Sequence, residues 1–195
     1  MRSNDNSKYS HPFEAGQFFH VYNHAVGSDL LFREKENYQF FLNRYKYYLN
    51  QHIDLYAYCL LPNHFHLLIK VREDSTNEMI SEQFRKFLIS YSKSFNKRFS
   101  RRGNLFEKHL KRVPVTNQEH LIWLVFYLHR NPVHHQYEEN FRIYPWSSFI
   151  SLLSEKNTQL ARDEVIALYS GRDNFRSFHE RNITDFEKVK DLMLE

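Results

Sequence analysis

The sequence predicts an α+β fold: helices pack on an antiparallel sheet in the ferredoxin-like split βαβ arrangement, and a small helical appendage follows at the C-terminus. Three observations support this prediction. Strand and helix patterns follow one another in the order β-α-β-β-α-β-α between residues 17 and 131. Two short apolar runs are joined directly by Pro62-Asn63, a turn pair. The 195 residues, 42% of them hydrophobic, suit one domain of ordinary size.

Local patterns predict the first four elements. Residues 17–26 mix aromatic and β-branched side chains with partial alternation, which indicates a strand. Residues 37–51 place aromatic side chains at helical spacing after an acidic turn, which indicates a helix with an aromatic seam. Residues 54–61 and 64–71 are short and apolar, and the Pro62-Asn63 turn between them predicts two antiparallel strands.

A long amphipathic helix and a short strand come next. The helix is expected to begin at Ser75 or Thr76 and to cover residues 77–99, with apolar side chains on one side and cations largely on another. The Arg102-Gly103-Asn104 stretch is expected to end it. Residues 109–115 are the candidate fourth strand, and Pro114 favours an edge position because proline cannot donate to a strand ladder.

Residues 117–131 form the last helix of the predicted core. Asn117 suits the N-cap position. Pro132 disfavours the α conformation at Asn131, so the helix is expected to end there. We divide the chain into a main domain of residues 1–150 and a helical C-terminal extension of residues 151–195, whose function no motif indicates.

Composition limits the compartment and the class of protein. The single cysteine, Cys59, cannot form an internal disulfide or a thiolate metal cluster, which fits a reducing cytosol. The N-terminus lacks the apolar region of a signal peptide, and no apolar run approaches the roughly 20 residues that span a bilayer. We therefore expect a cytoplasmic protein without a membrane partner.

Positive charge is concentrated in one segment. The net charge is only +4, but residues 85–112 carry ten cations against one acid, Glu107. Aromatic side chains are interleaved with these cations, as a nucleic-acid surface requires: cations for phosphate, ring faces for unstacked bases. A solvated helix face is the alternative. The candidate DNA-binding residues are Arg85, Lys86, Lys93, Lys97, Arg98, Arg101, Arg102, Lys108, Lys111 and Arg112.

Two histidines share one face of a predicted strand. Side chains two residues apart on a strand point the same way, so His64 and His66 can converge on one ion, or both can simply face solvent. Tyr127 and Asn131 are four residues apart and project from one face of the last predicted helix. If that face covers the strand, a phenol and an amide oxygen reach the same place as the two imidazoles.

Four motifs, in this order, carry a family resemblance: YAYCLLPNHFHLLIKV (56–71), NLFEKHLKRVPV (104–115), FYLHRNPV (126–133) and YPWSS (144–148). They resemble the IS200-like tyrosine transposases of the HUH nuclease superfamily, most of all the branch associated with repetitive extragenic palindromes. The similarity runs from about residue 16 to residue 150. It implies enzymes of DNA transposition and recombination that bind Mg²⁺ or Mn²⁺ and cut single-stranded DNA beside hairpins. The cut forms a 5′-phosphotyrosine link and needs no ATP.

The resemblance also assigns residues. His64, His66 and Asn131 match the metal ligands, and Tyr127 matches the nucleophile. A phenol with a reference pKa of about 10 is mostly protonated at neutral pH, so a cation that polarises the target phosphate would help the attack. His129 fits the family's Tyr-x-His pattern, and a structural or DNA-contact role is favoured for it.

One position departs from the family. Where relatives often have Tyr-Asn-Arg-Gly, this chain has Tyr22-Asn23-His24-Ala25, and His24 could partly replace the arginine. A domesticated hairpin-DNA-binding module without nuclease activity is the alternative function, although the intact ligand and nucleophile positions favour the enzyme. A monomer is favoured over a homodimer.

Overall fold

The computed structural model describes residues 11–181 and has the predicted α+β architecture. Four strands form one antiparallel sheet in the order β2-β3-β1-β4. The elements are β1 (Phe18–His24), α1 (Lys35–Leu49), β2 (Ile53–Leu61), β3 (His64–Val71), α2 (Asn77–Arg98), β4 (Lys111–Val115), α3 (Gln118–His134), η2 (Phe141–Ile143), α4 (Phe149–Leu153), α5 (Arg162–Leu168) and α6 (Arg172–Arg181).

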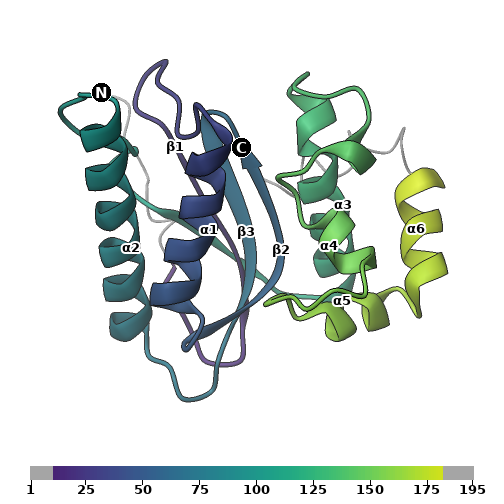
Figure 1. Cartoon of the computed structure of the whole chain (residues 1–195). Helices are drawn as coiled ribbons and strands as arrows, with labels where there is room; N and C mark the ends of the chain where they lie inside the picture. The colour runs from purple at the N-terminus through teal and green to yellow at the C-terminus, as the bar shows by residue number, and fades with distance from the viewer. Residues whose placement is uncertain (1–10, 182–195) are drawn as a thin grey trace, which may run out of the picture.

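Helices cover both faces of the sheet. α1 and α2 lie on one face, and α3 with the C-terminal helices lies on the other (Figure 1). Alternation along β3 divides its side chains between two cores: Phe65 and Leu67 join the core under α1 and α2, whereas Leu68 joins the core under α3. His64 and His66 therefore point toward α3.

The pairing of the strands agrees with the sequence patterns. β2 and β3 form a hairpin through the Pro62-Asn63 turn, with Leu61 opposite His64. β1 lies between β3 and β4, and its His24 is opposite His64. Within residues 11–181, β4 pairs only with β1, so the edge position that Pro114 predicted is confirmed for the described sheet.

The predicted end of α3 is wrong. The N-cap is Asn117, as expected, and its side chain accepts a hydrogen bond from the backbone N–H of His120. The helix does not stop at Asn131 but continues through Pro132 to His134. The backbone N–H of His135 still bonds to the carbonyl of Asn131 at 3.0 Å, so only the single N–H that proline lacks is lost.

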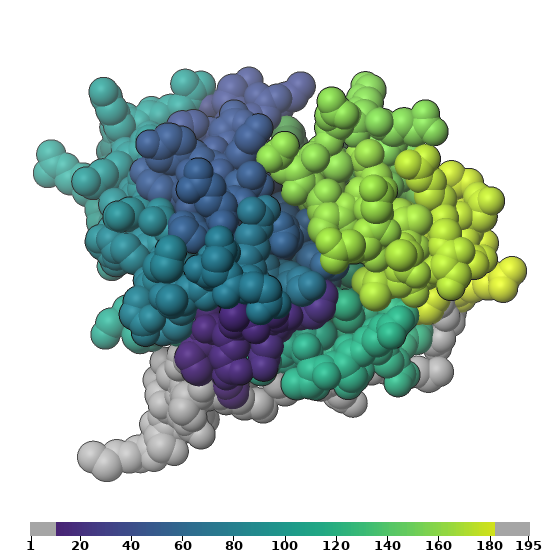
Figure 2. Space-filling view, turned by 90° about the horizontal axis from the view of Figure 1, so that it is seen from below, coloured from purple at the N-terminus to yellow at the C-terminus, as the bar shows by residue number. Residues whose placement is uncertain are grey.

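The described part of the C-terminal segment completes the core beneath α3. Val165, Tyr169 and Phe175 are buried there. The Tyr169 hydroxyl donates to the carbonyl of Ile122 in α3 at 2.7 Å. In Figure 2 the green and yellow atoms of this segment lie directly against the blue and teal atoms of the sheet and helices. None of the helices within residues 11–181 has the length and apolar character that a bilayer crossing needs.

Candidate active site

A cluster of histidines lies on the α3 face of the sheet. His64 and His66 come from β3, and His20 and His24 come from β1, because alternate residues of neighbouring strands share a face. The ring of His24 stacks on that of His64, with centroids 4.7 Å apart and planes inclined by 12°. The Nε2 of His20 lies 3.0 Å from the Nδ1 of His66.

Tyr127 belongs to α3 and faces this cluster of histidines. Its ring centroid is 6.1 Å from that of His66 and 6.5 Å from that of His20, edge-on to both. The phenol and the paired imidazoles therefore meet within one chain. Tyr127 exposes only 2% of its surface, so its side chain is almost completely covered in this structure.

Two buried side chains present acceptors that the protein does not satisfy. His64 donates its Nδ1–H to the amide oxygen of Asn63 at 2.7 Å, which leaves the lone pair on Nε2. Asn131 donates its side-chain N–H to the carbonyl of Tyr127 at 3.1 Å, which turns its Oδ1 away. Neither the Nε2 of His64 nor the Oδ1 of Asn131 has a hydrogen-bond partner within residues 11–181. Unsatisfied buried acceptors are costly and need an explanation, such as a cation site.

The histidines are neutral at pH 7. Burial, helped by the neighbouring His24 and His135, lowers the pKa of His64 to about 2. Burial also lowers the pKa of His20 to about 3 and holds the pKa of His66 well below 6.5. A neutral imidazole offers a nitrogen lone pair, which is the form that binds metal.

These donors fit a divalent cation. The buried Nε2 of His64 and Oδ1 of Asn131, and the imidazole of the neighbouring His66, are groups of the kind that bind divalent cations, and they come from β3 and α3. No three His, Cys, Asp or Glu side chains in the described chain are arranged to hold a metal ion by themselves, so the oxygen of Asn131 is needed to complete the set. Three protein ligands leave coordination positions for substrate oxygens and water.

His135 belongs to this site and was not predicted from the sequence. Its ring lies 4.7 Å from that of His64, and its Nε2 is buried without a hydrogen-bond partner in the described chain. His135 is four residues after Asn131, at the spacing that places both on one helix face. That signal was present, but the expected helix end at Asn131 excluded it.

The two auxiliary histidines have different surroundings. His129 is fully buried, and its ring nitrogens meet His179 at 2.9 Å and the hydroxyl of Ser148 at 2.8 Å. These contacts give His129 a structural position inside the protein. His24 is partly exposed and stacks on His64, so it borders the candidate site.

The sheet separates most of the predicted DNA-binding cations from Tyr127. α2 carries five of them, Arg85, Lys86, Lys93, Lys97 and Arg98, on the opposite face of the sheet (Figure 1). Some of the cations are held by acids of the chain: Arg85 and Lys86 pair with Glu82, Arg98 with Glu34, and Arg101 with Asp29, while Arg102 is exposed in the following loop.

The edge strand β4 brings the cations to both faces. Lys111 lies on the histidine side, with its Nζ 5.5 Å from the ring centroid of Tyr22. Arg112, the next residue, points to the other side, where it bonds to the hydroxyl of Ser81 at 3.3 Å and lies over the ring of Phe13. Lys111 is therefore the predicted cation that the structure places beside the candidate site.

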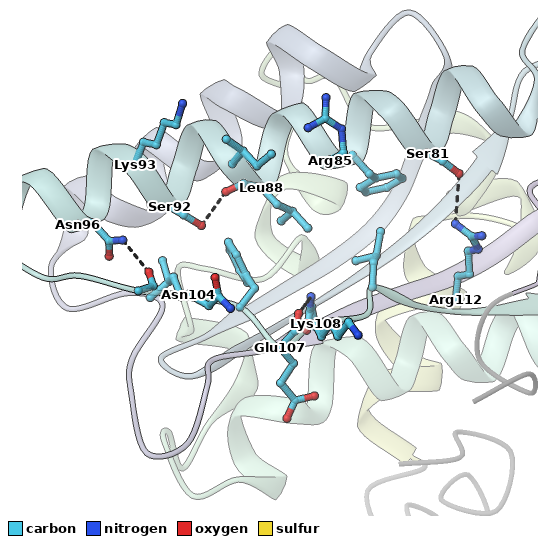
Figure 3. Close-up of a pocket in the computed structure, with 17 residues that line it drawn as sticks. Ser81, Arg85, Leu88, Ser92, Lys93, Asn96, Asn104, Glu107, Lys108 and Arg112 are labelled. Atoms are coloured by element: carbon cyan, nitrogen blue, oxygen red, sulfur yellow. Dashed lines mark hydrogen bonds between the residues drawn. The ribbon is translucent and has the colours of Figure 1, made fainter. Parts of the chain in front are cut away.

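A groove of about 570 Å³ runs between α2 and residues 103–112. Its lining includes the apolar side chains of Phe84, Leu88 and Phe106. Figure 3 shows cations on both sides of it, with Arg85 and Lys93 on α2 and Lys108 on the facing segment. An apolar floor with a basic rim suits unpaired nucleotides, whose bases are flat and apolar and whose phosphates are anionic.

Comparisons with known proteins show what this chain is similar to. No family model matches the chain. A protein of Haemophilus influenzae, provisionally named a REP-associated tyrosine transposase, is 30% identical over 100 residues, which cover 48% of this chain and 57% of that protein. The chain thus matches little more than half the length of this relative.

A solved structure of a REP-associated tyrosine transposase bound to a REP hairpin superimposes with a TM-score of 0.65. It is 16% identical to this chain and covers 75% of it, and the match takes in 85% of that structure. The chain has the fold of that transposase. The resemblance to the palindrome-associated branch, predicted from four motifs, is confirmed by both comparisons.

Proposed function

We propose that this protein cuts and rejoins single-stranded DNA beside hairpins, as in DNA transposition, with Tyr127 as the nucleophile. One observation carries the proposal: the Tyr127 ring lies edge-on to His66, in the layer where His64 and Asn131 bury acceptors without partners in the described chain. The similarity to REP-associated tyrosine transposases, one of them bound to a hairpin, supports the same substrate class.

His64, His66 and Asn131 are the residues that would hold Mg²⁺ or Mn²⁺. When bound, such a cation polarises the scissile phosphate and stabilises negative charge on its non-bridging oxygens. The hydrogen bonds from His64 to Asn63 and from Asn131 to the Tyr127 carbonyl engage the other nitrogen of each side chain, which leaves the Nε2 of His64 and the Oδ1 of Asn131 for the cation. Binding therefore requires little reorganisation of these side chains.

Tyr127 supplies the attacking oxygen. Its phenolic oxygen forms a bond to phosphorus, and the bond from phosphorus to the 3′ oxygen of the preceding nucleotide breaks. The phenol gives up its proton, and the released 3′ oxygen takes one up. The products are a 5′-phosphotyrosine and a free 3′-hydroxyl, and the reverse reaction rejoins the strand without ATP.

The groove beside α2 would receive the unpaired DNA next to the hairpin. β4 is a free edge, with Arg112 lining the groove on one face and Lys111 beside the histidines on the other. A single strand that follows these cations passes around the edge from the groove toward Tyr127. The path uses the charges of the predicted basic segment on both faces of the sheet.

Substitution of the nucleophile tests the proposal. Tyr127→Phe removes one oxygen and keeps the buried ring, so we expect hairpin DNA to bind as in the wild type while no protein becomes covalently linked to DNA. The assay incubates protein and labelled hairpin-bearing single strand with Mn²⁺ and looks for a denaturation-resistant shifted band. His64→Ala should lose the same band. A wild-type protein that binds the hairpin but forms no such band would be a binding module instead of a nuclease.

A further inference from the structure

His20 is a buried histidine that the proposed reaction does not use. It exposes 3% of its surface and its ring lies nearly parallel to that of His66, with centroids 5.2 Å apart. The Nε2 of His20 faces the Nδ1 of His66 at 3.0 Å, a hydrogen-bond distance. His20 therefore contacts His66 at Nδ1, the ring nitrogen opposite the Nε2 that we propose as the ligand atom.

The direction of this hydrogen bond decides what His66 can do. In a hydrogen bond between two imidazole nitrogens, one nitrogen donates a hydrogen and the other accepts it. If His66 donates from Nδ1, its Nε2 carries a lone pair and can bind a cation. If His66 accepts at Nδ1, its Nε2 carries the hydrogen and cannot be a ligand.

His64 shows the arrangement that a ligand needs. Its Nδ1 faces the amide oxygen of Asn63, which can only accept, so His64 is fixed with its hydrogen on Nδ1. The hydroxyl of Tyr137 donates to the same oxygen at 3.2 Å and holds the amide in place. One of the two paired histidines is therefore locked in the tautomer whose Nε2 is available.

We propose that His20 is the positioning residue for His66: it accepts the Nδ1–H of His66 and so holds His66 in the tautomer whose Nε2 binds the cation. The role of the cation rests on the proposed function, whereas the tautomer is a property of the metal-free protein. Ligating histidines usually donate to a carboxylate, a backbone carbonyl or water. A neutral imidazole performs this task here without adding a buried negative charge.

The tautomer can be measured directly. Long-range ¹H–¹⁵N spectra of the metal-free full chain distinguish a histidine protonated on Nδ1 from one protonated on Nε2. We expect His66 to carry its hydrogen on Nδ1 in the wild type. His20→Phe keeps a ring beside Tyr22 but removes the acceptor, so the tautomer should become mixed. His20→Gln places an amide oxygen near the position of Nε2 and should restore it.

Cation affinity is the second readout. By calorimetric titration with Mn²⁺ alone, His20→Phe should bind about 10- to 100-fold more weakly than the wild type, the usual cost of losing such a partner. His20→Gln should recover most of the affinity. His120→Gln is the matched control: it makes the same change at a histidine of α3 but leaves the His20–His66 contact intact, and should leave the His66 tautomer and Mn²⁺ affinity unchanged.

The outcomes separate this inference from the proposed function. Wild-type His66 protonated on Nε2, or a His20→Phe variant with unchanged tautomer and Mn²⁺ affinity, would overturn the role of His20 even if Tyr127 forms covalent DNA. If no covalent DNA forms but His66 has the expected tautomer and His20→Phe disturbs it, the positioning role stands and the nuclease proposal fails. The wild-type spectrum decides the tautomer even if His20→Phe does not fold.

Discussion

Every ring nitrogen of the buried His129–His179 pair has a partner that fixes its hydrogen. The Nδ1 of His179 faces the carbonyl of Phe175 at 2.8 Å, which can only accept, so His179 carries its hydrogen there. Its Nε2 then accepts from the Nδ1 of His129 at 2.9 Å. The Nε2 of His129 accepts in turn from the hydroxyl of Ser148 at 2.8 Å. With both imidazoles neutral, each of these three hydrogen bonds has one donor and one acceptor.

This arrangement predicts that acid destabilises the fold through His179. Burial lowers the pKa of His179 to about 3, whereas the unfolded chain has the ordinary value of 6.5. Between pH 6 and pH 4, His179 therefore binds a proton in the unfolded state but not in the folded state. The contribution of His179 to the free energy of unfolding is fully present above pH 6.5 and falls by about 1.4 kcal/mol per pH unit between pH 6 and pH 4. Denaturant titrations across this range measure the slope.

The same titrations on His179→Gln isolate this group. Glutamine can still accept from His129 but does not titrate, so the slope should become shallower by about one proton, although the free energy of unfolding at pH 7 also decreases. His109→Gln, which makes the same change at an exposed histidine, is the matched control for the substitution itself. An unchanged slope in His179→Gln would contradict the assignment.

At the residue scale, the sequence predicts that two side chains share a face when both lie in one strand or one helix. His64 with His66, and Tyr127 with Asn131, were found because each pair lies within one element. His20 was not found, because its contact with His66 depends on the register between β1 and β3. Contacts between elements are set by tertiary packing, which periodicity along the chain does not encode.

At the scale of elements, the hairpin was predicted well and the end of α3 was not. The β2–β3 hairpin follows from two apolar runs around one turn pair, a local signal. The end of α3 failed because a local preference was overruled. Proline disfavours the α conformation before it, but Asn131 and Pro132 are both buried, and packing of this turn against the sheet outweighs that cost. The continued helix is what brings His135 to His64.

The cations of the predicted basic segment, residues 85–112, are also divided between the two faces of the sheet. Alternation on β4 turns Lys111 toward the histidines and Arg112 toward the groove, and α2 holds its cations on the groove side. A charge count along the chain cannot show this division, because it depends on which face of the sheet each element occupies.

The groove between α2 and residues 103–112 predicts a selective loss of DNA affinity. Lys93→Ala with Lys108→Ala removes one exposed cation from each side of the groove. For a hairpin with an unpaired flank, affinity should fall, and the slope of log affinity against log salt should become shallower by about 1.4, at about 0.7 per phosphate contact of a single strand. Fluorescence anisotropy at several salt concentrations measures both.

Two comparisons make this test specific. Lys46→Ala with Lys156→Ala removes the same charge from exposed positions on α1 and after α4, and should leave the salt slope unchanged. A hairpin trimmed of its unpaired flank should bind the groove variant as tightly as the wild type. An equal loss for the trimmed hairpin would mean that these cations contact the duplex and that the groove does not receive the single strand.

At the scale of the whole molecule, one chain contains every part of the proposed site. β1 and β3 supply the histidines, α3 lies over them with Tyr127 and Asn131, and α5 and α6 complete the core that holds α3 against the sheet. The alternative is an assembly in which the tyrosine of one subunit acts at the histidines of another. The 6.1 Å between the rings of Tyr127 and His66 in a single chain favours a monomer that works alone.

Mixing two inactive variants distinguishes these arrangements. Tyr127→Phe keeps the ligands, and His64→Ala keeps the nucleophile. If each site uses residues of one chain, a mixture of the two variants contains no complete site, and we expect no covalent DNA at any ratio. The control mixes wild-type protein with either variant while hairpin is in excess. The covalent yield per wild-type chain should stay constant, which shows that the inactive variant does not compete for DNA. Covalent DNA in the mixture would instead show that Tyr127 reaches the histidines of a partner, so the arrangement within one chain would not be the catalytic one.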